Sequence, residues 1–95
     1  GTGKPAAYGL PVLQKVDASR NETQALILSP TRELCLQIAD DLENYSKYLP
    51  GVRVLPVYGG ANIEPQIRTL RKGVQVIVAT PGRLIDLMER KAASL

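Results

Sequence analysis

The chain has 95 residues, which is enough for one small domain or for a piece of a larger one. Its composition is that of an ordinary globular protein, with 44% hydrophobic and 22% charged residues, and its net charge of +3 is a mild basic excess compatible with a polyanionic partner. Histidine is absent and Cys35 is the single cysteine, which excludes histidine-dependent catalysis, histidine or cysteine-cluster metal sites and an internal disulfide. No apolar run approaches the ~18 residues of a membrane span, so we expect a soluble α/β protein of a reducing compartment, the cytoplasm.

The first predicted elements are a helix and a strand joined by a polar loop. The helix runs from Ala6 to about Val16, and Pro11 within it indicates a bend or an interruption. The polar segment Lys15–Thr23 is expected to form the exposed loop that enters the first strand. That strand is Ala25–Leu28, a continuous apolar run of the kind found where a strand is covered on both faces.

A longer helix and a second strand are predicted next. One apolar stripe of the helix is formed by residues that recur every three or four positions: Leu34, Ile38, Leu42, Tyr45 and Leu49. The run Val52–Tyr58 then predicts a strand. Because Pro56 within it lacks an N–H, we expect this strand at an edge of the sheet.

The rest of the chain predicts a helix, a strand and a last helix. The shorter apolar stripe, with its flanking cap residues, consists of Asn62, Ile63, Ile67, Leu70 and Gly73. The β-branched run Val74–Ala79 predicts the third strand, and a helix beginning near Gly82 follows, with Leu84, Leu87 and Met88 on its apolar side. This alternation predicts right-handed βαβ crossovers and a parallel sheet in a three-layer α/β fold.

The chain begins with a glycine-rich segment, Gly1-Thr2-Gly3-Lys4. Glycines allow successive backbone N–H groups to close around phosphate oxygens, and a following lysine reaches the outer phosphates. Such tetrapeptides also occur at ordinary turns, so both interpretations stay open. A phosphate-binding loop needs Ser or Thr after the lysine to ligate Mg²⁺, but this position is Pro5, which offers no hydroxyl and no N–H.

Polar or glycine-rich segments follow each of the three strands. They are Ser29–Leu34, Tyr58–Gly60 and Thr80–Leu84. Because the carboxyl ends of parallel strands meet at one edge of a sheet, we expect these segments to lie together, where hydroxyl, guanidinium and helix N–H groups suit a phosphate. The alternative is purely structural: Thr31 caps its helix, Arg32 is a solvated charge and the glycines form a plain turn.

In their order and spacing, GTGK, PTREL, YGG and TPGRL resemble the N-terminal RecA-like domain of a DEAD-box ATP-dependent RNA helicase. The similarity extends along essentially the whole chain and includes AAYGLPVLQ, ALILSPTREL, Gln66 and VIVATPGRLIDLM. It implies that residues 1–95 form a partial RecA-like fold of the P-loop NTPase type, with three layers and a mostly parallel sheet of about three strands flanked by helices.

The resemblance also implies roles for individual residues. The ATP phosphate-binding residues would be Gly1, Thr2, Gly3 and Lys4. The residues that hold RNA by its sugar–phosphate backbone, independently of base sequence, would be Pro30, Thr31, Arg32, Glu33, Gly59, Gly60, Thr80, Pro81, Gly82 and Arg83. We interpret Cys35 and Gln37 as structural.

Several parts of such a helicase are absent from these 95 residues: the strand before the phosphate loop, the DEAD motif and the second RecA-like domain. The resemblance implies that the parent protein binds ATP and Mg²⁺ and unwinds short RNA duplexes. We expect the chain alone to bind neither cofactor, to contain no catalytic residue or metal site and to be inactive. We also expect the incomplete sheet to leave an open apolar edge at Val74–Ala79, through which the chain self-associates or exchanges strands.

Two other functions stay open. One is a non-catalytic RNA- or protein-binding α/β domain derived from such a helicase, which Pro5 favours. The other is a different P-loop enzyme, such as a DNA-directed helicase or a nucleotide kinase, and the PTREL and TPGRL segments argue against it. Neither involves a membrane.

Overall fold

The computed structural model describes residues 15–49 and 51–90. The segment Gly1–Lys4, Pro5 and most of the helix predicted from Ala6 lie outside the described residues. Lys15 and Val16, at the predicted end of that helix, are not helical and lead into the polar loop.

Strands and helices alternate along the described chain. In chain order they are β1 (Ala25–Leu28), α2 (Arg32–Ser46), β2 (Val54–Val57), α3 (Ile63–Lys72), β3 (Val76–Ala79) and α4 (Pro81–Glu89). The predicted second and third strands are two to three residues too long, because only four residues of each make ladder pairs. The element order and types otherwise agree with the sequence-based prediction.

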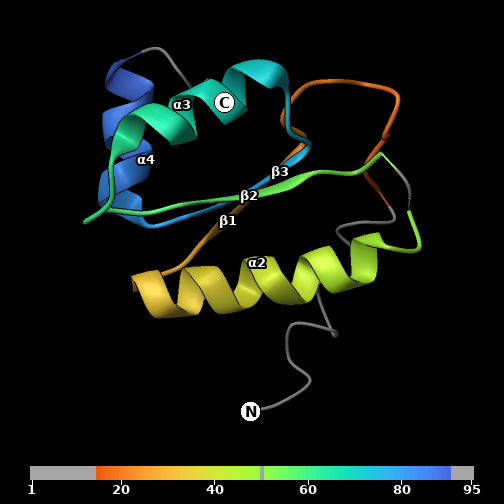
Figure 1. Cartoon of the computed structure of the whole chain (residues 1–95), viewed down its shortest axis with the longest axis horizontal. Helices are drawn as coiled ribbons and strands as arrows, with labels where there is room; N and C mark the ends of the chain where they lie inside the picture. Colours follow the sequence, from red (N-terminus) through yellow and green to blue (C-terminus); the bar gives the residue numbers. More distant parts are fainter. Residues whose placement is uncertain (1–14, 50, 91–95) are drawn as a thin grey trace.

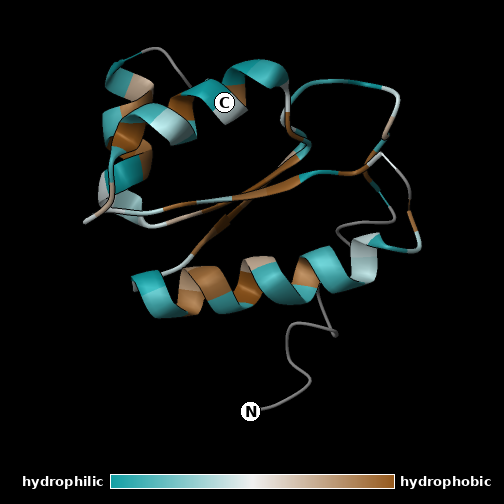
Figure 2. Cartoon of the chain, in the orientation of Figure 1, coloured by the Kyte–Doolittle hydropathy of each residue, from teal (hydrophilic) through white to brown (hydrophobic). Residues whose placement is uncertain are grey.

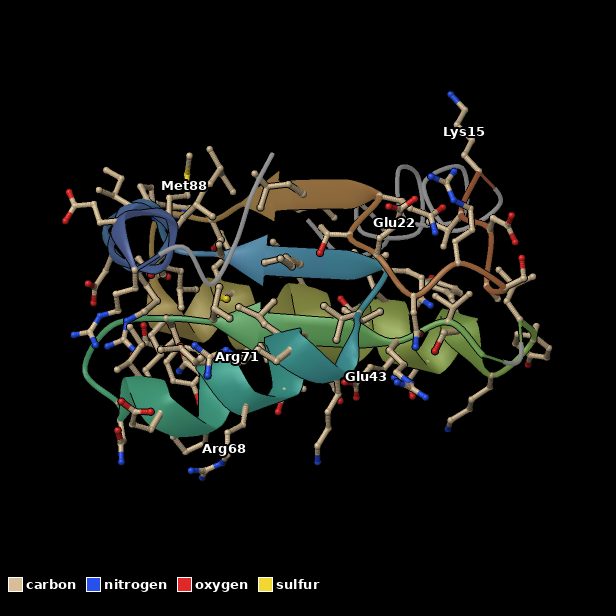
Figure 3. All side chains as sticks on the ribbon, turned by 90° about the horizontal axis from the view of Figure 1, so that it is seen from above. Lys15, Glu22, Glu43, Arg68, Arg71 and Met88 are labelled. Atoms are coloured by element: carbon tan, nitrogen blue, oxygen red, sulfur yellow. The ribbon has the colours of Figure 1, made fainter. Side chains whose placement is uncertain are left out.

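The three strands form one parallel sheet in the order β1-β3-β2. The edge position predicted for β2 from Pro56 is confirmed. The open edge that we expected at β3 is wrong, because this strand pairs with both of its neighbours and all four of its residues are buried. Within the described part of the chain, the unpaired edges belong to β1 and β2 instead, and β1, which has no proline, lies at one side of the sheet in Figure 3.

The sheet is the middle of three layers, with α2 on one face and α3 and α4 on the other (Figure 1). Alternate residues of β3 point to opposite faces: Val76 and Val78 pack in the core under α2, and Ile77 and Ala79 in the core under the other two helices. Figure 2 shows the apolar strands between helix faces of the same character. This arrangement confirms the three-layer α/β fold.

The face that α2 turns to the sheet begins with a different residue from the predicted stripe, although Ile38 and Leu42 belong to both. Cys35 is fully buried, whereas Leu34 is 42% exposed. The buried set Cys35, Ile38, Ala39 and Leu42 has the i, i+3, i+4, i+7 spacing of a helix face, with cysteine as its first apolar member. Burial raises the pKa of the Cys35 thiol, whose Sγ donates to the carbonyl of Val78 at 3.1 Å, and the interpretation of this residue as structural agrees with that environment.

Asn62 and Gly73 lie at the two ends of α3, where their residue types suit the local backbone. The Asn62 side chain accepts from the N–H of Glu64 at the start of α3, and Gly73 ends this helix with a φ of +97°. A Cβ on Gly73 would lie 2.9 Å from the carbonyl oxygen of Asn21, in the loop before β1. Next to it, buried Gln75 accepts from the N–H of Arg53, which fixes the loops at the amino end of the sheet.

Candidate nucleic-acid interface

The three segments that follow the strands lie side by side at the carboxyl edge of the sheet. The N–H of Ser29 donates to the carbonyl of Ala79 at 2.8 Å, and the N–H of Thr80 donates to the carbonyl of Val57 at 3.0 Å. Both bonds continue the strand ladders by one residue into the loops. The prediction that these segments meet at one edge is therefore confirmed, and we call their assembly the carboxyl-edge site (Ser29–Glu33, Tyr58–Ala61 and Thr80–Arg83).

In the first segment, the Thr31 side chain accepts from the N–H of Leu34 at 3.1 Å and so caps α2. The structural interpretation of this threonine is confirmed, but a hydroxyl that accepts one bond still has a proton to donate outward. Buried Ser29 supports the turn through its Oγ, which donates to the Thr31 carbonyl at 3.2 Å.

Arg32 is exposed, yet it is not simply a free solvated charge. Its guanidinium carbon lies 4.9 Å from the centre of the Tyr58 ring, a cation–π distance. This contact joins the first segment to the second and holds a positive charge beside the two glycines that follow the tyrosine. Pro30 and Glu33 are also exposed in this segment.

In the second segment, Gly59 and Gly60 are exposed, and a Cβ built on either residue meets no atom within 4 Å. The backbone of Gly60 requires glycine because its φ is +82°. The φ of Gly59 lies outside the left-handed region, so neither its conformation nor its packing explains why a side chain is absent there.

In the third segment, α4 begins without a side-chain cap. Thr80 makes no cap hydrogen bond, Pro81 occupies the first turn, and a Cβ on exposed Gly82 would meet no atom within 4 Å. The first-turn N–H groups of this helix thus carry the positive end of the helix dipole without a side-chain acceptor. By contrast, α2 and α3 are capped by their own side chains.

Arg83 is directed inward rather than toward solvent. One of its terminal nitrogens, Nη1, donates to Oε1 of Gln66 at 3.1 Å, and Nη2 donates to the carbonyl of Ala61 at 2.9 Å. The Tyr58–Ala61 loop therefore lies between two arginines, with Arg32 over its first residue and Arg83 bonded to its last.

Sequence analysis missed the part played by Gln66 in this site. The residue is only 8% exposed and lies on the buried face of α3 with Ile67, and its Nε2 approaches the Tyr58 carbonyl at 3.4 Å. A signal was present, because Gln66 is one turn from both Ile63 and Leu70 and so interrupts an apolar stripe with a polar side chain. Gln37, which we interpreted as structural, is exposed instead, and its side chain donates to Asp41 of the same helix.

The described residues offer few other kinds of site. In residues 15–49 and 51–90, no three or more Cys, Asp or Glu side chains gather closely enough to hold a metal ion. No helix in this part of the chain has the length and apolar character needed to cross a membrane. What the carboxyl edge offers is therefore exposed backbone, hydroxyl groups and positive charge, which suit phosphate oxygens.

Comparisons with known proteins all point to one family of helicases. A family model described as DEAD/DEAH box helicase matches residues 1–95. The chain is 50% identical over 95 residues to the ATP-dependent RNA helicase CshA of Listeria monocytogenes and to the ATP-dependent RNA helicase DeaD of Mycobacterium tuberculosis. The match covers 100% of this chain but only 18% and 17% of those two proteins, so the chain spans less than a fifth of the length of these relatives.

Solved structures agree on the fold. The yeast DEAD-box splicing factor Prp28 superposes with a TM-score of 0.87 at 32% identity, covering 99% of this chain and 24% of that one. A hypothetical ATP-dependent RNA helicase from Sulfolobus tokodaii gives a TM-score of 0.81 at 37% identity, covering 97% of this chain and 25% of that one.

Proposed function

The chain belongs to the DEAD/DEAH box helicase family, and from this membership we propose that it is part of the N-terminal RecA-like domain of an ATP-dependent RNA helicase, where it holds one RNA strand by its backbone. The whole protein would bind RNA, use ATP and unwind short duplexes. The contribution of this chain would be the carboxyl-edge site and the last part of the ATP phosphate loop.

The main structural support for this proposal is the uncovered backbone at the carboxyl edge. A Cβ on Gly59 or on Gly82 would meet no atom within 4 Å, and neither residue has a left-handed φ, so the fold itself does not require glycine at either place. Glycine at such a position lets another chain approach the backbone closely. With the uncapped N-terminus of α4 and the exposed Arg32 beside them, these glycines suit a phosphodiester chain bound without base contacts.

The donor set at the start of the chain fits a nucleotide only in part. Gly1, Gly3 and Lys4 have the chemistry to bind the phosphates of ATP, which would be the energy source of the parent protein. Pro5 has no hydroxyl for Mg²⁺, so the residues present do not complete a metal site and we derive no hydrolytic step through it. We propose that the isolated chain holds neither ATP nor Mg²⁺ productively.

The RNA-binding proposal is tested by replacing Arg32 with alanine in the intact protein. Loss of one phosphate-neutralising charge should weaken binding of single-stranded RNA about five- to tenfold, equally for different sequences, and should reduce the slope of log affinity against log salt by about one. Filter binding or fluorescence anisotropy at several KCl concentrations measures both quantities.

The matched control is Arg68→Ala, which removes the same charge from the exposed side of α3 (Figure 3). It should leave the affinity close to that of the unmodified protein. Equal affinity of the Arg32→Ala protein and the unmodified protein would place RNA elsewhere.

A polypeptide of these 95 residues is expected to release no phosphate from ATP above background, because it has Lys4 but neither a hydroxyl at Pro5 nor an acidic DEAD sequence. Phosphate release with and without Mg²⁺ measures this. Hydrolysis that requires Mg²⁺ and disappears in Lys4→Ala would contradict this prediction.

The second candidate function is a non-catalytic RNA- or protein-binding domain, which Pro5 favours. It requires that the intact protein also lacks RNA-stimulated ATPase activity.

The same polypeptide should self-associate through the outer edge of β1. This edge has no partner strand in the described part of the chain, and Leu28 at its end is 56% exposed. Light scattering over a concentration series should show a mass above 10.3 kDa that rises with concentration. A folded monomer at the highest concentration would contradict this prediction.

A further inference from the structure

Arg83 and Gln66 form a bridge beneath the Tyr58–Ala61 loop. The guanidinium of Arg83 donates to Gln66 Oε1 at 3.1 Å and to the Ala61 carbonyl at 2.9 Å. The amide of Gln66 in turn approaches the Tyr58 carbonyl at 3.4 Å, a long and therefore weak bond. The two ends of the loop are thus connected through two side chains that come from different helices, α3 and α4.

The donors and acceptors around Gln66 fix which way its side-chain amide faces. A guanidinium only donates hydrogen bonds, so the Gln66 oxygen must face Arg83. The amide NH₂ must then face the Tyr58 carbonyl, which only accepts. A single orientation of one buried glutamine satisfies both neighbours, and no buried side-chain nitrogen or oxygen in the described residues lacks a partner.

The bridge acts on the glycine pair of the carboxyl-edge site. Gly59 and Gly60 lie between the two bonded carbonyls, are exposed and have no side chain to restrain them. A glycine pair loses more conformational freedom on ordering than any other pair of residues, and that cost weakens binding unless the loop is ordered beforehand. Bonds at Tyr58 and Ala61 restrain both ends of this pair before a ligand arrives.

We propose that Gln66 and Arg83 are positioning residues that hold the Tyr58–Ala61 loop in the conformation that receives RNA, and that Arg83 acts through this loop instead of neutralising a phosphate. The inference rests on the proposed function. It replaces the direct RNA contact that the resemblance implies for Arg83, because two nitrogens of its guanidinium are bonded within the protein.

A double-mutant cycle in the intact protein tests the inference, with a single-stranded oligouridylate as the probe. Gln66→Met keeps the side-chain volume but has no hydrogen-bond donor and only a weakly accepting sulfur, and Arg83→Lys keeps the charge but loses the planar fork. Each variant should weaken binding about tenfold, which corresponds to the loss of one hydrogen bond to a charged group. The double variant should bind no more weakly than the weaker single variant, because the two residues act as one unit.

The salt dependence separates positioning from direct contact. If Arg83 positions the loop, Arg83→Ala leaves the slope of log affinity against log salt unchanged. If it binds a phosphate, that variant lowers the slope by about one, Arg83→Lys binds nearly normally and the two single effects multiply, any of which overturns the inference. Arg68→Ala serves again as the control for the loss of a charge.

Hydrogen exchange of the Tyr58–Ala61 amides without RNA gives a second readout that does not depend on binding. Exchange should be faster in Gln66→Met than in the unmodified protein, and equal rates would overturn the inference. Failure of the unmodified protein to bind oligouridylate would contradict the proposed function instead, so the two failures are distinguishable.

Discussion

Replacing Gly82 by leucine is expected to weaken RNA binding about tenfold to a hundredfold without loss of stability. The added side chain meets no protein atom within 4 Å of its Cβ and stands in the first turn of α4, where leucine is the better helix former by up to about 0.5–1 kcal/mol. The same side chain would occupy the space in front of the uncapped helix N–H groups and exclude a phosphate from them. Affinity and stability should therefore change in opposite directions.

The measurement combines RNA titration with thermal unfolding of the intact protein. Gly82→Ala should show the same pattern with a smaller loss of affinity, since a methyl group fills less of the space. Arg68→Ala, on the outer side of α3, provides a variant that leaves both quantities unchanged. Normal RNA affinity of the Gly82→Leu protein would exclude the start of α4 from the RNA-binding surface.

Replacing Gly73 by alanine should have the largest effect on the fold, a loss of about 2–5 kcal/mol in the free energy of unfolding. Two costs add. The φ of +97° with a ψ of 120° is a region that residues with a Cβ avoid, at about 1–3 kcal/mol. The new Cβ would also lie 2.9 Å from the backbone oxygen of Asn21, which forces the loop before β1 to move, at about 1–3 kcal/mol.

The matched control for this loss is Gly59→Ala, at which the Cβ meets open space and the φ is outside the left-handed region. Denaturant titration should place this control within about 0.5 kcal/mol of the unmodified protein. Removing the Asn21 side chain as well, with Asn21→Ala, should restore little of the stability in Gly73→Ala, because the closest backbone contact remains. Wild-type stability of Gly73→Ala would mean that the two loops can separate at little cost.

Local patterns were sufficient to predict most of the fold. Proline at position 56 correctly placed β2 at an edge, and the caps at Asn62 and Gly73 marked both ends of α3. The position of β3 was predicted wrongly because strand order depends on pairing between distant residues. Its four consecutive buried residues, three of them β-branched, agree with a central strand.

The candidate site was predictable in its location but not in its internal contacts. Strand ends and motif order were enough to bring Thr31, Gly60 and Arg83 to one edge. The partner of Arg83 lies 17 residues earlier on another helix, a distance along the chain that no local spacing rule covers. The shift from Leu34 to Cys35 on α2 had a different cause, because cysteine packs as a small apolar residue and was not counted in the stripe.

The two backbone bonds beyond the strand ends, from Ser29 to Ala79 and from Thr80 to Val57, have a mechanical consequence. They fasten the starts of the first and third loops to the central and edge strands, so neither loop can swing away without breaking part of the ladder. If RNA binds along this edge as proposed, its backbone would have to follow the shape that these fastened loops present. In the proposed helicase, a domain movement would then displace this edge of the sheet as one unit relative to the part of the protein on the other side of the RNA.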